Sequence, residues 1–214
     1  MPETIIKHAS KTAITLMVFA LVFTALMAYV FTITKSPIEK SEADARMSLF
    51  GQIIPASLHD NDVLKDTVTL APDPLLGNQR PIVANITRLN GKPTAIILEA
   101  IAHDGYSGDI KLLIAIQVDG TIAGVRVIAH KETPGLGDYI DIAKDQWIKL
   151  FDKTSLNTHT DAQWKVKKDG GSFDYMAGAT ITPRAVVKAV HHALQYVKQH
   201  QQTLFAAPNL EPTT

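Results

Sequence analysis

A run of small residues that ends in a hydroxyl, Ala177-Gly178-Ala179-Thr180, lies immediately before the sequence signal for a C-terminal helix. Small side chains let a ligand approach the backbone, and the N-terminus of a helix offers unpaired N–H groups and the positive end of the helix dipole. Such a place suits an anion, above all a phosphate, and Arg184 could add positive charge. The alternative is a plain turn between a strand and a capped helix.

A second run, Glu132-Thr133-Pro134-Gly135-Leu136-Gly137, places two glycines around a leucine. Glycines permit close approach by a planar ligand or by another loop. The alternative is a Pro-Gly turn that leads into the next element. A third run contains Tyr106, which could stack on a ring, although half-burial on its own sheet is the simpler explanation. Trp147 and Trp164 are further candidate ring neighbours that core packing also explains.

Other kinds of chemistry are excluded or disfavoured by composition. The chain has no cysteine, so disulfides, thiolate zinc sites, cysteine-ligated iron–sulfur clusters and cysteine nucleophiles are absent. Its 21 basic and 21 acidic residues cancel, which removes the electrostatic argument for a nucleic-acid partner. The eight histidines lack the i, i+4 spacing of a metal site, and hydrolase, Walker and Rossmann fingerprints are missing. We expect no metal and no catalytic residue set.

The elements that position these runs are predicted from turn and helix signals. Asn90-Gly91 and Asp119-Gly120 are typical of tight hairpins, and they join four predicted strands: Ile82–Leu89, Lys92–Ile101, Ile110–Val118 and Thr121–Ala129. Alternation along the third strand predicts one buried face. A helix is expected over Asp138–Phe151, and the C-terminal helix is expected to start with Thr182 as N-cap and Pro183 at the first position. The predicted fold class is α+β, a mostly antiparallel sheet with flanking helices.

An uncharged stretch of 23 residues, Thr12–Thr34, is long enough to cross a bilayer as one helix. It exceeds the apolar core of a cleaved signal peptide, the alternative interpretation, and lacks a good cleavage site. Lysines on both sides leave the orientation undecided. The eleven-residue N-terminal tail favours a cytoplasmic N-terminus and an exported C-terminal domain. The expected organisation is a cytoplasmic tail (1–11), an anchor (12–34), a helical and irregular connector (35–80), a main domain (81–205) and a flexible tail (206–214).

The run Asp174-Tyr175-Met176-Ala177-Gly178-Ala179-Thr180 resembles the flavinylation motif Asp-x-x-Ser/Thr-Gly-Ala-Thr of the FMN-binding domain family. The Glu-Thr-Pro-Gly-Leu-Gly run at 132–137 is also similar to that family. The order of anchor, sheet, loop and flavin site resembles the G subunits of Rnf ion-translocating electron-transport complexes. One departure is Ala177, which stands where the motif has serine or threonine.

The resemblance implies a function and a site. FMN would be attached covalently through its phosphate to Thr180 by a separate flavin transferase, with Asp174 serving recognition by that enzyme. Ala177, Gly178 and Ala179 would leave room for the phosphate, and Glu132, Thr133, Leu136 and Gly137 would contact the ribityl chain or ring. The chain would then relay electrons in a bacterial inner-membrane complex, with its C-terminal domain in the periplasm and the other membrane subunits as partners.

Two alternatives remain open at this point. The first is the C subunit of a sodium-translocating NADH:quinone reductase, which shares the flavin chemistry but generally has a longer extramembrane part. The second is a cofactor-free, membrane-anchored domain for assembly or partner binding, which the alanine at position 177 favours. Detection of covalently bound flavin would distinguish the two flavin-carrying subunits from the cofactor-free domain.

Overall fold

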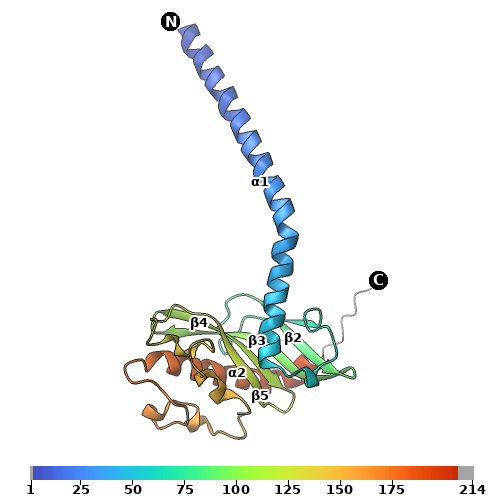
Figure 1. Ribbon diagram of the computed structural model, residues 1–214, viewed down its shortest axis with the longest axis vertical. Coiled ribbons are helices and arrows are strands. Elements are labelled where there is room, and N and C mark those ends of the chain that lie inside the picture. Colours follow the sequence, from blue (N-terminus) through green and yellow to red (C-terminus); the bar gives the residue numbers. More distant parts are fainter. Residues whose placement is uncertain (1, 207–214) are drawn as a thin grey trace. The chain divides into compact units, whose positions relative to one another are not determined.

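The computed structural model describes residues 2–206, and it has an α+β fold of two long helices and one antiparallel sheet (Figure 1). The chain divides into two compact units after Arg46. The predicted C-terminal tail, residues 206–214, lies outside the described residues except for Ala206.

Helix α1 (Pro2–Ile53) contains the predicted anchor. Its stretch His8–Lys35 has a mean hydropathy of 2.4 and is long and apolar enough to cross a membrane. Beyond the predicted anchor, α1 continues through Pro37 to Ile53. A helix can pass through one proline by giving up a backbone hydrogen bond.

The sheet contains five strands, β1 (Thr67–Leu70), β2 (Ile82–Leu89), β3 (Lys92–Gly105), β4 (Gly108–Gln117) and β5 (Ile122–Ala129). They pair antiparallel in sequence order. The two predicted hairpins are confirmed, with positive φ at Asn90, Gly91 and Gly120. Strand β1 was not predicted. Its four residues lie in a segment whose prolines and glycine are typical of irregular structure.

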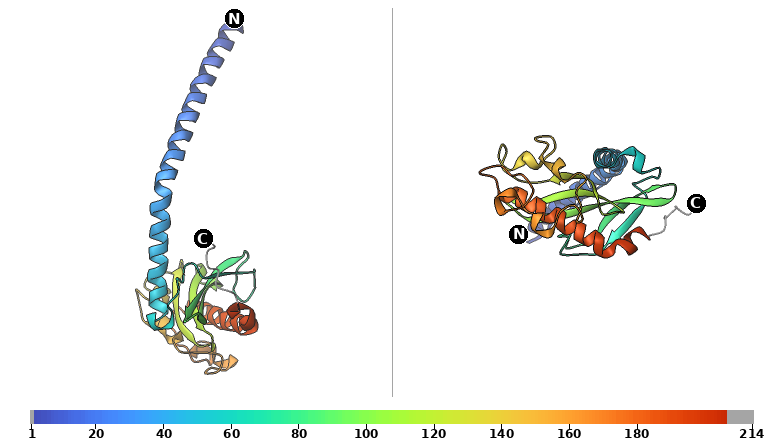
Figure 2. Two further views of the ribbon diagram at one scale, coloured as in Figure 1. Left: turned by 90° about the vertical axis from the view of Figure 1, so that its right-hand side faces the viewer. Right: turned by 90° about the horizontal axis from the view of Figure 1, so that it is seen from below.

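Each face of the sheet carries its own hydrophobic cluster. Helix α2 (Ile181–Phe205) lies along one face, as Figure 2 shows, and packs against β3 and β4. Leu112, Ile114 and Ile116 of β4 belong to this cluster. Leu113 and Ala115 belong to the other, together with Phe50 and Ile53 from the end of α1. The prediction that only one face of β4 is buried is therefore wrong, because the end of α1 covers the second face.

The end of α1 contacts β5 directly. At Gly124, a Cβ atom would lie 2.9 Å from the Ile53 Cα and 3.0 Å from the Ile53 carbonyl oxygen. Nearby, the buried Arg126 guanidinium donates to the Gln52 carbonyl oxygen at 2.8 Å. Arg126 thus satisfies a carbonyl that a helix C-terminus leaves unpaired, and Gly124 makes the close approach possible.

Replacing Gly124 by alanine is expected to lower the free energy of unfolding by about 1–3 kcal/mol, because the new methyl group meets backbone atoms that cannot rotate away. Gly51 in α1 is the matched control, since a Cβ there meets nothing within 4 Å. Gly51→Ala should leave stability unchanged or raise it by up to about 1 kcal/mol. Urea unfolding of the full chain in detergent, followed by tryptophan fluorescence, measures both. Equal changes in the free energy of unfolding for Gly124→Ala and Gly51→Ala would contradict the close approach of Gly124 to Ile53.

The predicted helix over Asp138–Phe151 is wrong. The structure has two short 3₁₀ helices there, Asp138–Ile140 and Trp147–Phe151, joined by turns. Asp141 accepts from the Ala143 backbone N–H at 2.9 Å, and Asp145 accepts from that of Trp147 at 2.8 Å. These aspartates offer the backbone local partners in place of a continuous helical ladder.

His103, at the end of β3, joins two surface segments. Its Nδ1 lies 2.8 Å from a carboxylate oxygen of Asp109, and its Nε2 lies 2.7 Å from the Gly77 carbonyl oxygen. Both partners are acceptors, so the ring satisfies both only when it carries two protons. The hydrogen bond to Asp109, followed by that to Gly77, raises the pKa of His103 above 6.5.

This geometry predicts a pH-dependent contribution to stability. Because the folded pKa is raised, the contribution is fully present below pH 6.5 and disappears as the pH rises through the folded pKa. The difference in free energy of unfolding between wild type and His103→Gln should therefore shrink across that range. Asp104 also raises the pKa of His103 and belongs to the same effect, whereas the titrations of groups that do not interact with His103 cancel in the difference. A difference that stays constant with pH would contradict a charged His103.

Candidate functional site

The start of α2 presents Thr180 beside a glycine turn. Gly178 has φ +88°, a conformation that favours glycine, and the Ala179 N–H donates to the Met176 carbonyl at 3.1 Å. Helix α2 begins at Ile181 with Thr180 as its N-cap, so the prediction of Thr182 as N-cap is wrong. Pro183 still lies in the first turn, where its missing N–H costs little. The Thr180 side chain makes no capping hydrogen bond, which leaves its hydroxyl available.

The 132–137 run forms a turn that faces this helix start. The Leu136 and Gly137 N–H groups donate to the Thr133 carbonyl at 3.1 and 3.0 Å. A carboxylate oxygen of Asp138 accepts from the Gly135 N–H at 2.7 Å, with Gly135 at φ +76°. The interpretation of this segment as a Pro-Gly turn is thus confirmed, and the same segment forms a wall of the pocket described next.

A pocket of about 270 Å³ lies between these two segments. Seven of the residues named from the sequence line it: Glu132, Thr133, Leu136, Gly137, Gly178, Ala179 and Thr180. Tyr106, a candidate ring neighbour, lines it as well, and Ile181 and Thr182 complete the wall. Ala177 and Asp174 are exposed and are not among the lining residues. Sequence reasoning missed Ile181, although its apolar side chain next to Thr180 was a visible signal.

Apolar side chains surround the opening of the pocket. Tyr106 is 68% exposed, Leu136 47% and Ile181 46%. None of the described residues that line the pocket is lysine or arginine. The favourable potential for an anion therefore comes from the backbone of the first turn of α2. The arrangement suits a molecule with an anionic group at one end and an apolar surface at the other.

Arg184 does not line the pocket. Its guanidinium makes a bidentate ion pair with Asp169, with both N···O distances at 2.6 Å. This pair lowers the pKa of Asp169 and raises that of Arg184. The prediction that Arg184 adds positive charge for a phosphate is weakened, because a carboxylate already neutralises it.

Two aromatic residues, Tyr139 and Trp147, hold the segment 174–176 that leads to Thr180. Trp147 Nε1 donates to the Asp174 carbonyl at 2.8 Å, and the Met176 N–H donates to the Tyr139 hydroxyl at 3.3 Å. Burial raises the pKa of Tyr139 to about 12, which keeps the phenol neutral. Trp147 and Trp164 are buried in the core and do not line the pocket, so packing explains both tryptophans.

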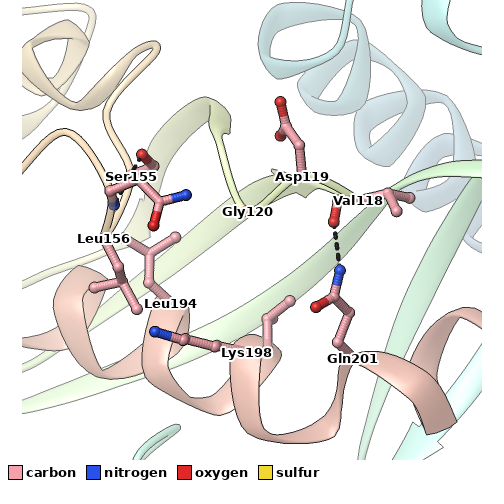
Figure 3. A pocket seen from close by; sticks show the side chains of 10 residues that line it. Val118, Asp119, Gly120, Ser155, Leu156, Leu194, Lys198 and Gln201 are labelled. Atoms are coloured by element: carbon pink, nitrogen blue, oxygen red, sulfur yellow. Dashed lines mark hydrogen bonds between the residues drawn. The ribbon is translucent and has the colours of Figure 1, made fainter.

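A second hollow, of about 140 Å³, lies between the β4–β5 turn and α2 (Figure 3). Gln201 closes one side by donating from Nε2 to the Val118 carbonyl at 2.7 Å. None of the site residues named from the sequence lines it. Among the side chains that the structure describes, no group of three histidine, aspartate or glutamate residues is arranged to hold a metal ion. The pocket beside Thr180 is the candidate site because the residues named from the sequence line it.

Comparison with known proteins gives two family matches and close relatives. Residues 105–195 match the FMN-binding domain, and residues 1–53 match the RnfG N-terminal region. The chain is 46% identical to the G subunit of the ion-translocating oxidoreductase complex of Vibrio cholerae, over 93% of this chain and 95% of that protein. It is also 46% identical to the corresponding protein of Pseudomonas aeruginosa, over 92% of each chain. A crystal structure of Shewanella oneidensis NqrC aligns with a TM-score of 0.47 and 21% identity, covering 69% of this chain and 76% of that one.

Proposed function

This chain belongs to the family of G subunits of ion-translocating oxidoreductase complexes, and from this membership we propose that it relays electrons through an FMN attached to Thr180. The attachment is a phosphoester between the flavin phosphate and Thr180 Oγ1. The chain acts as an electron-transfer subunit of an Rnf-type membrane translocase, with residues 81–205 as its flavin domain. The observation that carries the proposal is one pocket that unites the 132–137 turn with a hydroxyl not used as a cap.

Thr180 is a better attachment point than its neighbour Thr182. The Thr182 hydroxyl is engaged with the Glu132 carboxylate, and Thr182 is 1% exposed. Thr180 lines the pocket and makes no capping bond. During maturation Thr180 Oγ1 would lose its proton and bond the flavin phosphate that FAD supplies, with AMP as the leaving group. A Mg-dependent flavin transferase would catalyse this step.

The residues present fit an attached FMN. At Gly178 a Cβ would meet nothing within 4 Å, so the backbone beside Thr180 is open to a ligand. The first-turn N–H groups of α2 favour the single negative charge of a phosphodiester. Glu132, Thr133, Leu136 and Gly137 would contact the ribityl chain or ring, and Ala179 would leave room for the phosphate. The pocket is small for a flavin, so part of the molecule would remain exposed at the apolar rim.

FMN supplies a ring that accepts and donates electrons, which the side chains of this protein do not provide. The chain's own residues hold and orient that group. Tyr106 and Leu136 offer apolar surface to the ring, and the start of α2, where Ile181 adds apolar surface, binds the phosphate end. An exposed ring edge suits exchange of electrons with a partner, so no substrate needs to be enclosed.

Asp174 is proposed to serve recognition by the flavin transferase. Its side chain is exposed and pairs with Lys167 at 2.5 Å, while its carbonyl is held by Trp147. It lies outside the pocket, which favours a role with another protein. Ala177 is also exposed. A serine or threonine at this position, as in the motif, would point its hydroxyl toward water.

The partners proposed are the other membrane subunits of the complex, with no nucleic acid. The helix His8–Lys35 would anchor the chain in a bacterial inner membrane by a single pass, with the C-terminal domain in the periplasm. Covalent attachment suits an exported domain, because a dissociated FMN could not be replaced from the cytoplasm. Protease accessibility in intact inner-membrane vesicles tests the orientation. A C-terminal domain on the cytoplasmic side would contradict export.

The proposal is tested by producing the full chain with and without its flavin transferase. Flavin fluorescence should survive denaturing electrophoresis only in the first case. Absence of fluorescence in both would favour a cofactor-free assembly domain.

Identity of 46% across most of the chain favours the G subunit of an Rnf-type complex over the C subunit of a sodium-translocating NADH:quinone reductase, the other flavin-carrying alternative.

A further inference from the structure

Glu132 is buried in the wall of the pocket, and both of its carboxylate oxygens are used by the protein. Oε1 accepts from the Ser107 N–H at 2.9 Å, and Oε2 accepts from the Thr182 hydroxyl. Glu132 itself is 3% exposed. Two donors from different segments thus converge on the two oxygens of one buried side chain. The oxygens of Glu132 are therefore already paired, unlike the open backbone near Thr180.

The two donors belong to segments far apart in the sequence. Ser107 is 25 residues from Glu132 and lies in the turn between β3 and β4. Thr182 is 50 residues away and lies in the first turn of α2. The turn carries Tyr106 and the helix start carries Thr180, and both residues line the pocket. Glu132 thus links the aromatic side of the pocket to its attachment side.

Gly137 packs against the same pair. A Cβ there would lie 2.8 Å from Thr182 Oγ1 and 3.0 Å from Glu132 Oε2. Any side chain at this position would push against the hydrogen bond between them. The second glycine of the 132–137 run therefore leaves space for this link.

We infer that Glu132 is a positioning residue that ties the Tyr106 turn to the first turn of α2 and so fixes Tyr106 at the mouth of the flavin pocket. The inference rests on the proposed function, since it assigns the link a purpose for the flavin held at Thr180. Cutting the link should free the Tyr106 turn, so that the flavin becomes more accessible to solvent.

Thr182→Val cuts the link with little change of shape, and Thr182→Ser is the matched control that keeps the hydroxyl. Hydrogen exchange is measured on the full chain in detergent, made without the transferase so that it carries no flavin. Residues 105–108 should exchange about tenfold faster in Thr182→Val, as expected from losing one hydrogen-bonded tie. The β4–β5 turn should not change, and Thr182→Ser should match wild type. Gly137→Ala should resemble Thr182→Val.

The second measurement is iodide quenching of covalent flavin fluorescence in the same variants made with the transferase. Quenching is compared per bound flavin; it should increase in Thr182→Val, and Thr182→Ser should restore the wild-type value. Unchanged exchange in folded Thr182→Val would overturn the link. Faster exchange without increased quenching would overturn its role toward the flavin. A wild-type chain without covalent flavin would instead refute the proposed function, and the exchange measurement would still test the link.

Discussion

Thr180→Ala is expected to abolish all covalent flavin while leaving the domain folded. The variant removes the only atom proposed to bond the flavin phosphate. Thr180 is 9% exposed and its side chain makes no capping hydrogen bond, so its loss should lower the free energy of unfolding by about 1 kcal/mol, which leaves the domain folded. In-gel flavin fluorescence of the chain produced with the transferase measures attachment, and urea unfolding measures stability.

Two controls sharpen this result. Thr180→Ser keeps a hydroxyl at the same position and should retain covalent flavin. Thr182→Ser keeps the engaged hydroxyl of the neighbouring threonine and should also retain it. Fluorescence that survives in Thr180→Ala would mean that the flavin is attached elsewhere. Loss of fluorescence together with unfolding would mean that Thr180 acts on the fold.

Phe151→Ala is expected to cause the largest loss of stability among single changes near the site, about 3–5 kcal/mol. Phe151 is fully buried, and its ring centroid lies 4.8 Å from that of Phe173 and 5.5 Å from that of Trp147. Removing the ring would leave a cavity under the segment that leads to Thr180. Domains are stable by about 5–15 kcal/mol, so this loss should also reduce the yield of flavin-loaded protein.

The two tryptophans of the chain report on this cluster directly. Trp147 and Trp164 both belong to it, so the urea midpoint of their fluorescence follows its unfolding. Phe151→Leu, which fills most of the space, should cost about 1 kcal/mol. Leu150→Ala, at an exposed position, should lower the free energy of unfolding by less than about 0.5 kcal/mol. A Phe151→Ala midpoint close to that of wild type would refute the supporting role of the cluster.

Local signals predicted most of the fold. Asn90-Gly91 and Asp119-Gly120 specify tight turns by backbone conformation alone, which is why the four hairpin strands were predicted close to their observed bounds. The 138–151 segment shows the limit of periodicity. Its apolar spacing looked helical, but Asp141 and Asp145 bind nearby backbone N–H groups and favour turns. The burial of both faces of β4 depended on the end of α1, which strand alternation does not reveal.

The candidate site was predicted because its two halves carry unusual short runs. The 132–137 turn and the residues before α2 line one pocket, and the binding of FMN by these residues stays a prediction. The link from Glu132 to Ser107 and Thr182 was not predictable, since it joins residues 25 and 50 positions apart. Arg184 was misjudged for the same reason, because its partner Asp169 lies in a separate turn.

Mass spectrometry of one tryptic peptide tests the central claim most directly. Cleavage after Lys168 and Arg184 releases Asp169–Arg184, which contains both Thr180 and Thr182. In the chain produced with the transferase, this peptide should gain the mass of FMN less one water, and fragment ions should assign the gain to Thr180. An unmodified peptide, or a modification assigned to Thr182, would contradict the account.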